Sequence, residues 1–211
     1  MDSDSVAERI ADRLMKDIFR QRRIDNNFRG PWTEFMVAEA IGNECEVVSH
    51  GWHPWDLQIG DRTKEFPERI RIQVKNTARL QTWHKPGDKL SDCQWVLRIG
   101  SPPEYFLEQN RDVPCESYGH LCDLYVLCFH PEEDFDIADH QDPFQWEFYL
   151  VPATTDHSMF PVKERPTSQK TYQSYRVRPE SLKQGIRGRP PVAPLTFGEL
   201  DIAAVRRTLA I

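Results

Sequence analysis

The sequence lacks the signatures of several large functional classes. No stretch approaches the ~18 consecutive apolar residues of a membrane-spanning helix. The ten glycines form no Gly-rich phosphate loop, and no Gly-x-Ser-x-Gly elbow is present. We therefore expect neither a membrane protein, nor an NTPase, nor a serine hydrolase of that type. The first residues, Met-Asp-Ser-Asp-Ser, are acidic rather than basic and then apolar, so we expect no signal peptide.

An excess of basic residues and a framework of paired cysteines are also missing. The net charge of −6 argues against nucleic-acid binding, but affinity depends on where Lys and Arg cluster. Local clusters occur at residues 20–23, at Arg69 with Arg71, and at residues 187–189; each is equally compatible with DNA contact and with a solvated surface. The five cysteines show no Cys-x₂-Cys spacing, which predicts a reducing, cytoplasmic location.

The length and composition predict an ordinary globular chain. With 211 residues, of which 39% are hydrophobic, the chain is long enough to bury one sizeable core. An amphipathic helix is expected over residues 5–23, because Val6, Ile10, Leu14 and Ile18 recur one turn apart. We divide the chain into this N-terminal helical region (1–27), a core (28–152) and a C-terminal extension with a terminal helix (153–211).

The core pattern predicts an α/β fold with a mixed central sheet flanked by helices. A helix is expected from Pro31 to about Gly42, with Trp32, Phe35, Met36 and Ala40 on its buried side. A further helix is expected at 104–109, and the capping box Thr196–Glu199 predicts the start of a last helix through Leu209. Strands are expected at 45–49, 54–59, 70–75, 94–99, 123–129, 146–151 and 172–178. The strand at 123–129 is almost wholly apolar, as in strands buried on both faces.

The stretch from Pro54 to Thr77 carries the candidate chemistry. Strand alternation places Arg69, Arg71, Gln73 and Lys75 on one face, and Ile70, Ile72 and Val74 on the other. In the preceding strand, Asp56 and Gln58 lie opposite Trp55, Leu57 and Ile59. Pairing these strands through their apolar faces sets Asp56, Gln73 and Lys75 side by side. A carboxylate, an amide oxygen and an ammonium gathered there could hold a divalent ion and an activated water.

These residues resemble a known nuclease signature. Asp56 followed by Gln73-x-Lys75 is similar to the PD-(D/E)xK motif, in the variant in which Gln replaces the second acid, as in Mrr-type restriction nucleases and some homing endonucleases. Pro54 stands one position early, because Trp55 intervenes. Glu34 resembles the family's acid on a preceding helix. The resemblance covers roughly residues 28–152 and implies a restriction-endonuclease-like αβββαβ core.

The resemblance also implies a function and roles for residues. It implies a metal-dependent DNA endonuclease of restriction or defence type, using Mg²⁺ with Mn²⁺ as a substitute, and a homodimer is expected for cutting both strands. Asp56, Gln73, the Val74 carbonyl and Glu34 would hold the metal, and Lys75 would orient or deprotonate the attacking water or neutralise developing charge. The candidate nucleic-acid contacts are Arg71, Asn76, Thr77 and His53.

Several alternatives stay open from the sequence. The polar residues around Asp56 could be an ordinary strand surface, and Glu34 or Glu39 a simple surface carboxylate. The fold could bind nucleic acid or a protein partner without cleavage, or serve as a structural subunit of a defence or repair complex. A zinc site is a further rival, since four potential ligands lie close in sequence: Cys115, His120, Cys122 and Cys128.

Overall fold

The structure is a computed structural model that describes residues 3–49, 55–99, 120–153, 159, 173–186 and 188–211. Several sequence predictions lie outside these residues: the helix at 104–109, the candidate contact His53, Pro54 of the motif, the candidate zinc ligand Cys115 and Arg187 of the third basic cluster. Within the described part of the chain, no helix is both long and apolar enough to cross a membrane.

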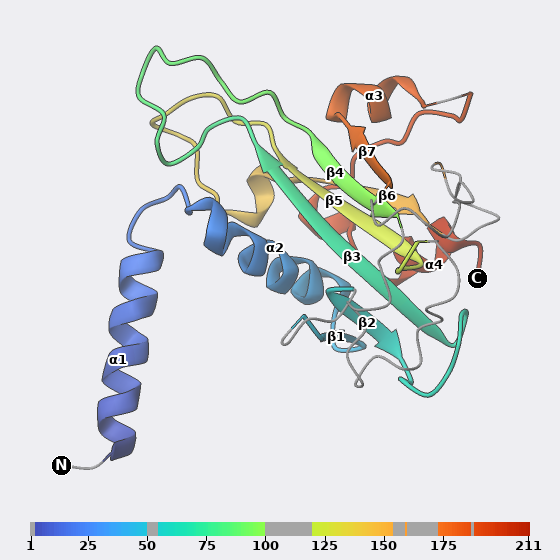
Figure 1. The fold of residues 1–211 in the computed structure, drawn as a ribbon, viewed down its shortest axis with the longest axis horizontal. Helices are drawn as coiled ribbons and strands as arrows, with labels where there is room; N and C mark the ends of the chain where they lie inside the picture. The colour runs from blue at the N-terminus through green and yellow to red at the C-terminus, as the bar shows by residue number, and fades with distance from the viewer. Residues whose placement is uncertain (1–2, 50–54, 100–119, 154–158, 160–172, 187) are drawn as a thin grey trace, which may run out of the picture.

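A five-stranded mixed sheet forms the centre of the molecule (Figure 1). Its spatial order is β1-β2-β3-β5-β6, and all neighbours are antiparallel except β3 and β5, which run parallel. The predicted α/β class with a mixed sheet is therefore confirmed. The strands span Cys45–Val47 (β1), Leu57–Gly60 (β2), Arg69–Ala78 (β3), Leu124–His130 (β5) and Glu147–Pro152 (β6).

Helices cover one face of this sheet. Helix α2 (Asn26–Ile41) and helix α4 (Ile202–Leu209) pack against the apolar side chains of β2, β3, β5 and β6, forming the first core cluster. The alternation of β3 explains this contact, because Ile70, Ile72 and Val74 all point to the helical face. The apolar face of β3 is thus the one that the sequence predicted.

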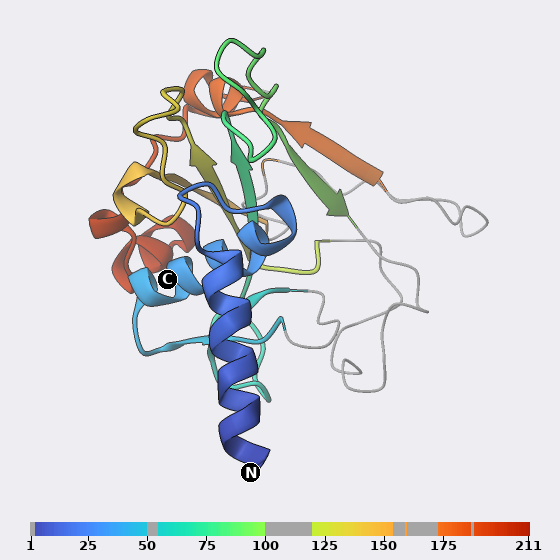
Figure 2. The ribbon, with the colours of Figure 1, turned by 90° about the vertical axis from the view of Figure 1, so that its left-hand side faces the viewer.

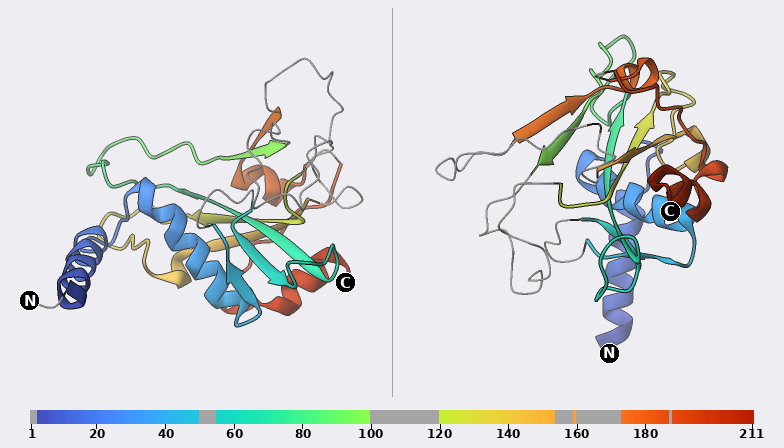
Figure 3. Two further views of the ribbon diagram at one scale, coloured as in Figure 1. Left: turned by 60° about the horizontal axis from the view of Figure 1, so that its bottom comes forward. Right: turned by 90° about the vertical axis from the view of Figure 1, so that its right-hand side faces the viewer.

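A two-stranded sheet covers the opposite face (Figure 3). It consists of β4 (Trp95–Ile99) paired antiparallel with β7 (Gln173–Val177), followed by the short helix α3 (Pro179–Gln184). The second core cluster lies between this layer and the side chains of β5 and β6 that point away from the helices. All seven residues of β5 are buried, which confirms the predicted strand that is covered on both faces.

The order of elements follows the expected nuclease core only in part. Helix α2 precedes β1, β2 and β3, and the parallel strand β5 comes next in the sheet. The connection from β3 to β5 contains β4, and its remainder lies in residues 100–119, outside the described part. The restriction-endonuclease-like core therefore stays a prediction.

The helix boundaries correct several predictions. Helix α1 ends at Ile18 rather than at residue 23, and α2 begins at Asn26, so that Pro31 lies inside the helix. The cause is Asp25, whose carboxylate accepts the Asn27 N–H and caps the helix earlier. Phe35, predicted to be buried, is 53% exposed, because the face of α2 that meets the sheet carries Met36, Val37 and Ile41 instead.

The C-terminal extension packs into the same body. Strand β7 completes the two-stranded sheet, and α4 adds Ala204, Val205 and Leu209 to the first core cluster. The predicted capping box forms, but it closes a single 3-10 turn, Phe197–Glu199, after which Asp201 caps α4. A second 3-10 turn, Pro143–Gln145, precedes β6.

Candidate functional site

Asp56 directly precedes β2, at the point where β2 begins and the antiparallel β3 continues past it. The ladder between the two strands closes at Leu57 opposite Ile72, and the Asp56 N–H donates to the Ile72 carbonyl at 2.9 Å. One step further, Asp56 Oδ2 accepts the Val74 N–H at 2.7 Å. The carboxylate thus takes the place of a strand partner, which fixes its position at this edge of β3.

This break in the ladder changes the environment of Trp55. The sequence predicted that Trp55 shares a face with Leu57 and Ile59, but Trp55 lies in the second core cluster and the other two lie in the first. Because the Asp56 hydrogen bonds depart from the regular ladder, strict alternation does not extend back through Asp56. The Trp55 ring instead lies 5.7 Å from the guanidinium carbons of Arg69 and Arg71.

Lys75 lies beside Asp56, as the sequence predicted. Its Nζ is 3.9 Å from Asp56 Oδ2, and the Lys75 and Asp56 side chains are 34% and 15% exposed. Gln73 precedes Lys75 on the same face of β3 and is paired in register with Tyr125 of β5. The structure therefore brings the carboxylate and the ammonium together, and the two-residue spacing places the Gln73 amide on the same face.

Burial and charge act in opposite directions on Asp56. Burial raises the pKa of its carboxyl group, while the Lys75 ammonium and the Val74 N–H lower it. A buried carboxylate with one cation nearby is well suited to gain from a second, divalent cation.

Glu34 of α2 contacts the segment that lies next to Asp56. Its Oε2 accepts the Ser49 hydroxyl at 2.7 Å, and the adjacent residue, Val48, donates its N–H to the Asp56 carbonyl at 2.9 Å. Glu34 is therefore tied to the segment that runs alongside Asp56. Glu39, the alternative acid on this helix, is exposed. Of the two acids, Glu34 is the one linked to Asp56, through Ser49 and Val48, and its membership of the site stays a prediction.

The available donors fit a hard divalent ion. The Asp56 and Glu34 carboxylates, the Gln73 amide and the Val74 carbonyl offer only oxygen, which Mg²⁺ and Mn²⁺ prefer. In a strand the N–H and C=O of one residue point to the same neighbour, so the Val74 carbonyl points to the edge where its N–H meets Asp56. Among the described residues, no three His, Cys, Asp or Glu side chains gather around a common point. The metal site therefore stays a prediction.

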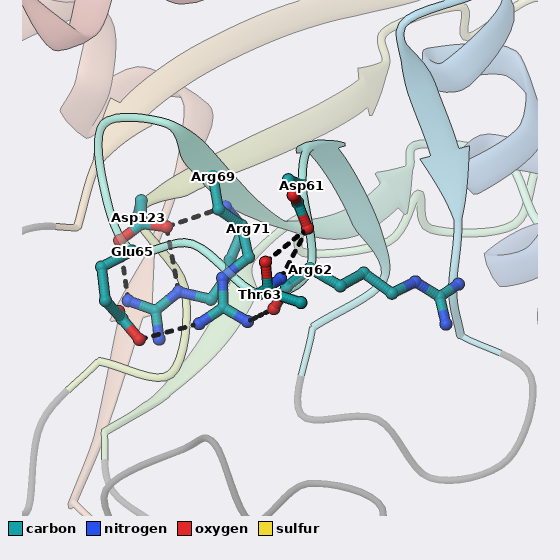
Figure 4. A network of polar contacts seen from close by, with 7 residues as sticks. All are labelled: Asp61, Arg62, Thr63, Glu65, Arg69, Arg71 and Asp123. Atoms are coloured by element: carbon teal, nitrogen blue, oxygen red, sulfur yellow. Dashed lines mark hydrogen bonds and ion pairs between the residues drawn. The ribbon is translucent and has the colours of Figure 1, made fainter.

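Arg71 is held by a buried ion pair (Figure 4). Its Nη2 lies 2.9 Å from Asp123 Oδ1, its Nε 3.0 Å from Oδ2, and its backbone N–H donates to Oδ2 at 2.7 Å. The Asp123 side chain is 3% exposed. The pair occupies Nε and Nη2 and is largely buried, so the geometry favours a structural role over the predicted nucleic-acid contact.

The next predicted contacts also point into the protein. Asn76 Oδ1 accepts from Arg29 Nε at 2.8 Å, and Asn76 Nδ2 donates to the Thr33 hydroxyl at 3.3 Å, on the face covered by α2. Thr77 is buried. Sequence reasoning assigned both residues to substrate contact because they follow Lys75; the structure places them in polar packing between β3 and its neighbours.

Arg29 is a residue that sequence reasoning missed. It is 3% exposed, and three amide oxygens accept its N–H groups: Asn76, Gln81 and Asn26, at 2.8, 2.8 and 2.7 Å. Burial lowers the pKa of Arg29 to about 10, although the nearby Cys93 and Asp25 side chains act in the opposite direction and raise it. The signal in the sequence was weak, because a charged residue near a helix start is usually read as exposed. This network joins α2 to β3 behind the Asp56–Lys75 pair.

The zinc rival is not supported by the arrangement of its described residues. Cys128 lies in the first core cluster and Cys122 in the second, so they belong to opposite faces of the sheet. Burial raises the pKa of both thiols, which disfavours the thiolate that zinc requires. His120 Nδ1 lies 3.1 Å from the Tyr125 hydroxyl instead. Tyr125 is a neighbour of Gln73 that the sequence did not reveal, since the β3–β5 register depends on the fold.

Comparison of the chain with protein-family models, with curated proteins and with solved structures finds no match.

Proposed function

We propose that the protein is a metal-dependent DNA endonuclease that hydrolyses phosphodiester bonds, of restriction or defence type. The observation that carries this proposal is the Asp56 carboxylate, fixed by the Val74 N–H just before the start of β2 and placed 3.9 Å from Lys75 Nζ. A carboxylate, an amide and an ammonium at one strand edge can bind a divalent ion and act on a phosphodiester. The resemblance of Asp56 and Gln73-x-Lys75 to the nuclease motif supports the same function.

The charge of each side chain suggests its role in this reaction. Asp56 would anchor Mg²⁺ or Mn²⁺, with Gln73, the Val74 carbonyl and Glu34 as further ligands. The bound ion would lower the pKa of a water and stabilise negative charge on the phosphate. Lys75 would orient or deprotonate the attacking water, or neutralise charge as the bond breaks, because its ammonium lies beside the anchoring carboxylate.

A basic and aromatic loop offers a surface for the nucleic acid. It follows β3 directly, and the Ser91 N–H donates to the Arg79 carbonyl at 3.0 Å, which closes its base. Trp83 is 61% exposed in this loop, with exposed Lys85 and Lys89 nearby in sequence. An exposed aromatic ring with lysines around it is a common platform for an unpaired base and its phosphate.

The setting of the enzyme is part of the same proposal. Cutting both strands of a duplex with one site per chain favours a homodimer. The described cysteines, Cys45, Cys93, Cys122 and Cys128, are all free thiols. Free, largely buried thiols suit the reducing cytoplasm, which we propose as the location.

The direct test is a cleavage assay with purified protein. Supercoiled plasmid, phage DNA and single strands would be incubated with Mg²⁺, Mn²⁺ or EDTA, using wild type, Lys75→Ala and Asp56→Asn. Lys64→Ala is a matched control, because Lys64 is exposed in the turn between β2 and β3. We expect metal-dependent cleavage that both site variants lose and the control keeps. Cleavage by Lys75→Ala at the wild-type rate would remove Lys75 from the mechanism.

A second candidate function is a nuclease-fold module that binds nucleic acid or a protein without cutting. One observation favours it: Gln73 stands where the motif usually has an acid, which removes a negative charge and weakens metal binding. DNA binding that is equal in wild type and Asp56→Asn, with no cleavage in any metal, would select this function.

A further inference from the structure

Helix α1 (Ser3–Ile18) stands away from the rest of the molecule (Figures 1 and 2). Every residue from 7 to 17 is exposed, including Ile10 (62%), Leu14 (56%) and Met15 (52%). A shallow depression along the helix is lined only by residues at its C-terminal half and just beyond: Ile10, Arg13, Leu14, Lys16, Asp17 and Arg20. Within the described part of the chain, nothing covers this apolar face.

The segment that follows the C-terminal end of α1, residues 19–22, is attached to the rest of the protein by several contacts. The Phe19 ring lies 5.1 Å from the Trp32 ring of α2. Gln141 Nε2 donates to the carbonyls of Phe19 and Gln21 at 3.2 and 2.8 Å, and Arg22 Nη1 donates to the Asp136 carbonyl at 2.8 Å. These contacts hold the segment after α1 on the body, so the helix projects in a defined direction.

The apolar stripe of α1 requires a partner. Val6, Ile10, Leu14 and Ile18 recur at one-turn spacing and form one side of the helix. A 16-residue helix is marginal on its own in water, and helical stability in proteins comes mainly from packing of the apolar face. The stripe is the surface through which this packing would occur.

Charge along the helix selects the partner. Residues 2–8 contain three acids and no base, whereas residues 9–20 contain four bases and two acids. The N-terminal end is therefore acidic and the C-terminal end basic. Two such helices attract each other when they lie antiparallel, because each acidic end then meets a basic end; the helix dipoles favour the same arrangement.

We propose that α1 pairs antiparallel with α1 of a second copy of this chain, forming a two-fold symmetric dimer. Each body is attached at the C-terminal end of its helix, so the antiparallel pair, about 24 Å long, keeps the two bodies at opposite ends. The inference rests on exposure and charge alone and does not depend on nuclease activity.

The interface is small, so the dimer is reversible. Two 16-residue helices bury less than the ~1,200 Å² typical of stable complexes. We therefore expect association to depend on protein concentration. Sedimentation velocity and light scattering over about 1 to about 200 micromolar protein bracket the affinity of a small interface. The mass of the wild type should rise from 24.7 kDa toward twice that value.

Two double variants test the surface. Ile10→Gln with Leu14→Gln removes the centre of the stripe and should stay monomeric at every concentration. Arg9→Gln with Asp12→Gln makes the same number of changes at exposed positions outside the stripe and should dimerise like the wild type. A dimer that persists in the first variant would place the interface elsewhere, and a monomeric wild type would overturn the proposal. Monomers whose α1 binds anionic vesicles would assign the helix to a lipid surface instead.

Charge reversals at the two ends test the direction of pairing. Glu8→Lys makes the acidic end less acidic and should weaken the antiparallel dimer about two- to tenfold, the range expected for a few exposed ion pairs. Lys16→Glu makes the basic end less basic and should weaken it likewise. In a parallel pair like ends meet, so each change would relieve repulsion; a dimer that either change strengthens or leaves unaffected would overturn the antiparallel arrangement.

Discussion

The Asp56 carboxylate accepts the Val74 N–H at 2.7 Å, at the point where β2 no longer reaches β3. One side chain therefore completes the hydrogen bonding of a strand edge and forms the anionic centre of the candidate site. The same contact directs the Val74 carbonyl toward this edge and leaves Lys75 next to the carboxylate. Structure and proposed chemistry depend on one residue, which makes its substitution informative.

Asp56→Asn should separate these two roles. The Asn oxygen can still accept the Val74 N–H, and a neutral side chain avoids the cost of burying a charge. We expect the free energy of unfolding to stay within about 1 kcal/mol of wild type or to rise. The rate of Mg²⁺-dependent cleavage should fall by at least about 100-fold. This is more than the loss expected when a residue that only hydrogen-bonds to a metal ligand is removed. Urea unfolding and plasmid cleavage measure the two effects; retained cleavage would exclude Asp56 as the metal anchor.

Metal binding should weaken as the pH falls. Burial raises the pKa of the Asp56 carboxyl, so protons compete with Mg²⁺ at a higher pH than for an exposed aspartate. From about pH 8 down to about pH 4, where an exposed aspartate titrates, the Mg²⁺ concentration for half-maximal binding should increase. Calorimetric titration measures this, with Asp56→Asn as the reference. A wild-type affinity that does not change over this range would contradict the site.

Loss of the Asp123 carboxylate should lower the free energy of unfolding without removing a residue of the candidate site. Asp123→Ala leaves the Arg71 guanidinium without its buried partner, which typically costs about 3–5 kcal/mol. Arg71→Met with Asp123→Leu removes both charges and should recover part of that loss. Denaturant unfolding compares the variants. If Arg71→Ala instead kept full stability and lost DNA binding, Arg71 would be a nucleic-acid contact after all.

The buried histidine pair should make the fold sensitive to acid. Burial lowers the pKa of His140 to about 3, with His130 and Arg29 adding to the effect. Its ring lies 4.8 Å from that of His130, whose pKa burial also lowers. In the unfolded chain the His140 ring takes up a proton near pH 6.5, whereas in the folded chain it stays neutral until about pH 3. The contribution of neutral His140 to the free energy of unfolding is therefore complete above pH 6.5 and is lost as the pH falls toward 3.

His140→Asn tests this dependence. His140 Nδ1 accepts the Ile24 N–H at 3.0 Å, and an Asn oxygen can accept the same N–H. The wild type should lose roughly 3 kcal/mol by pH 4 through His140, and the variant should lack that part of the loss. Urea unfolding at several pH values provides the comparison. Identical pH profiles for the two proteins would show that His140 already titrates normally in the fold.

Trp83 should contribute to binding of unpaired nucleic acid. If its exposed ring stacks on a base, Trp83→Ala should cost about 1–3 kcal/mol of affinity for single strands, and Trp83→Phe much less. Fluorescence anisotropy with a labelled oligonucleotide measures this, with Phe144→Ala as a control, since Phe144 is 75% exposed on the turn before β6. Equal affinity of wild type and Trp83→Ala would remove the loop from the binding surface.

The alternation of side chains allowed the centre of the site to be predicted. Residues 69–75 alternate between basic or polar and branched apolar side chains, and the observed strand places Ile70, Ile72 and Val74 under α2. The same period placed Gln73 and Lys75 on one face, and pairing with the preceding strand brought Asp56 to Lys75. The apolar run at 123–129 likewise had few alternatives to a buried strand.

Other features followed from contacts between distant segments. Arg71 looks like a DNA contact until Asp123, 52 residues later, is seen to pair with it. Asn76 follows Lys75 in sequence, but Arg29 of α2 holds it on the opposite face. Pairing of β4 with β7 joins segments more than 70 residues apart, and no local pattern specifies that register.

The sequence by itself determined the α/β class, most strands, and the meeting of Asp56 with Lys75. These depend on the two-residue period of a strand and on burial of one apolar face, which are local properties. Only the tertiary structure decided which polar groups face solvent and which satisfy one another inside. Burying a charge or an amide requires a partner, and that partner, as with Asp123 for Arg71, comes from wherever the fold brings it.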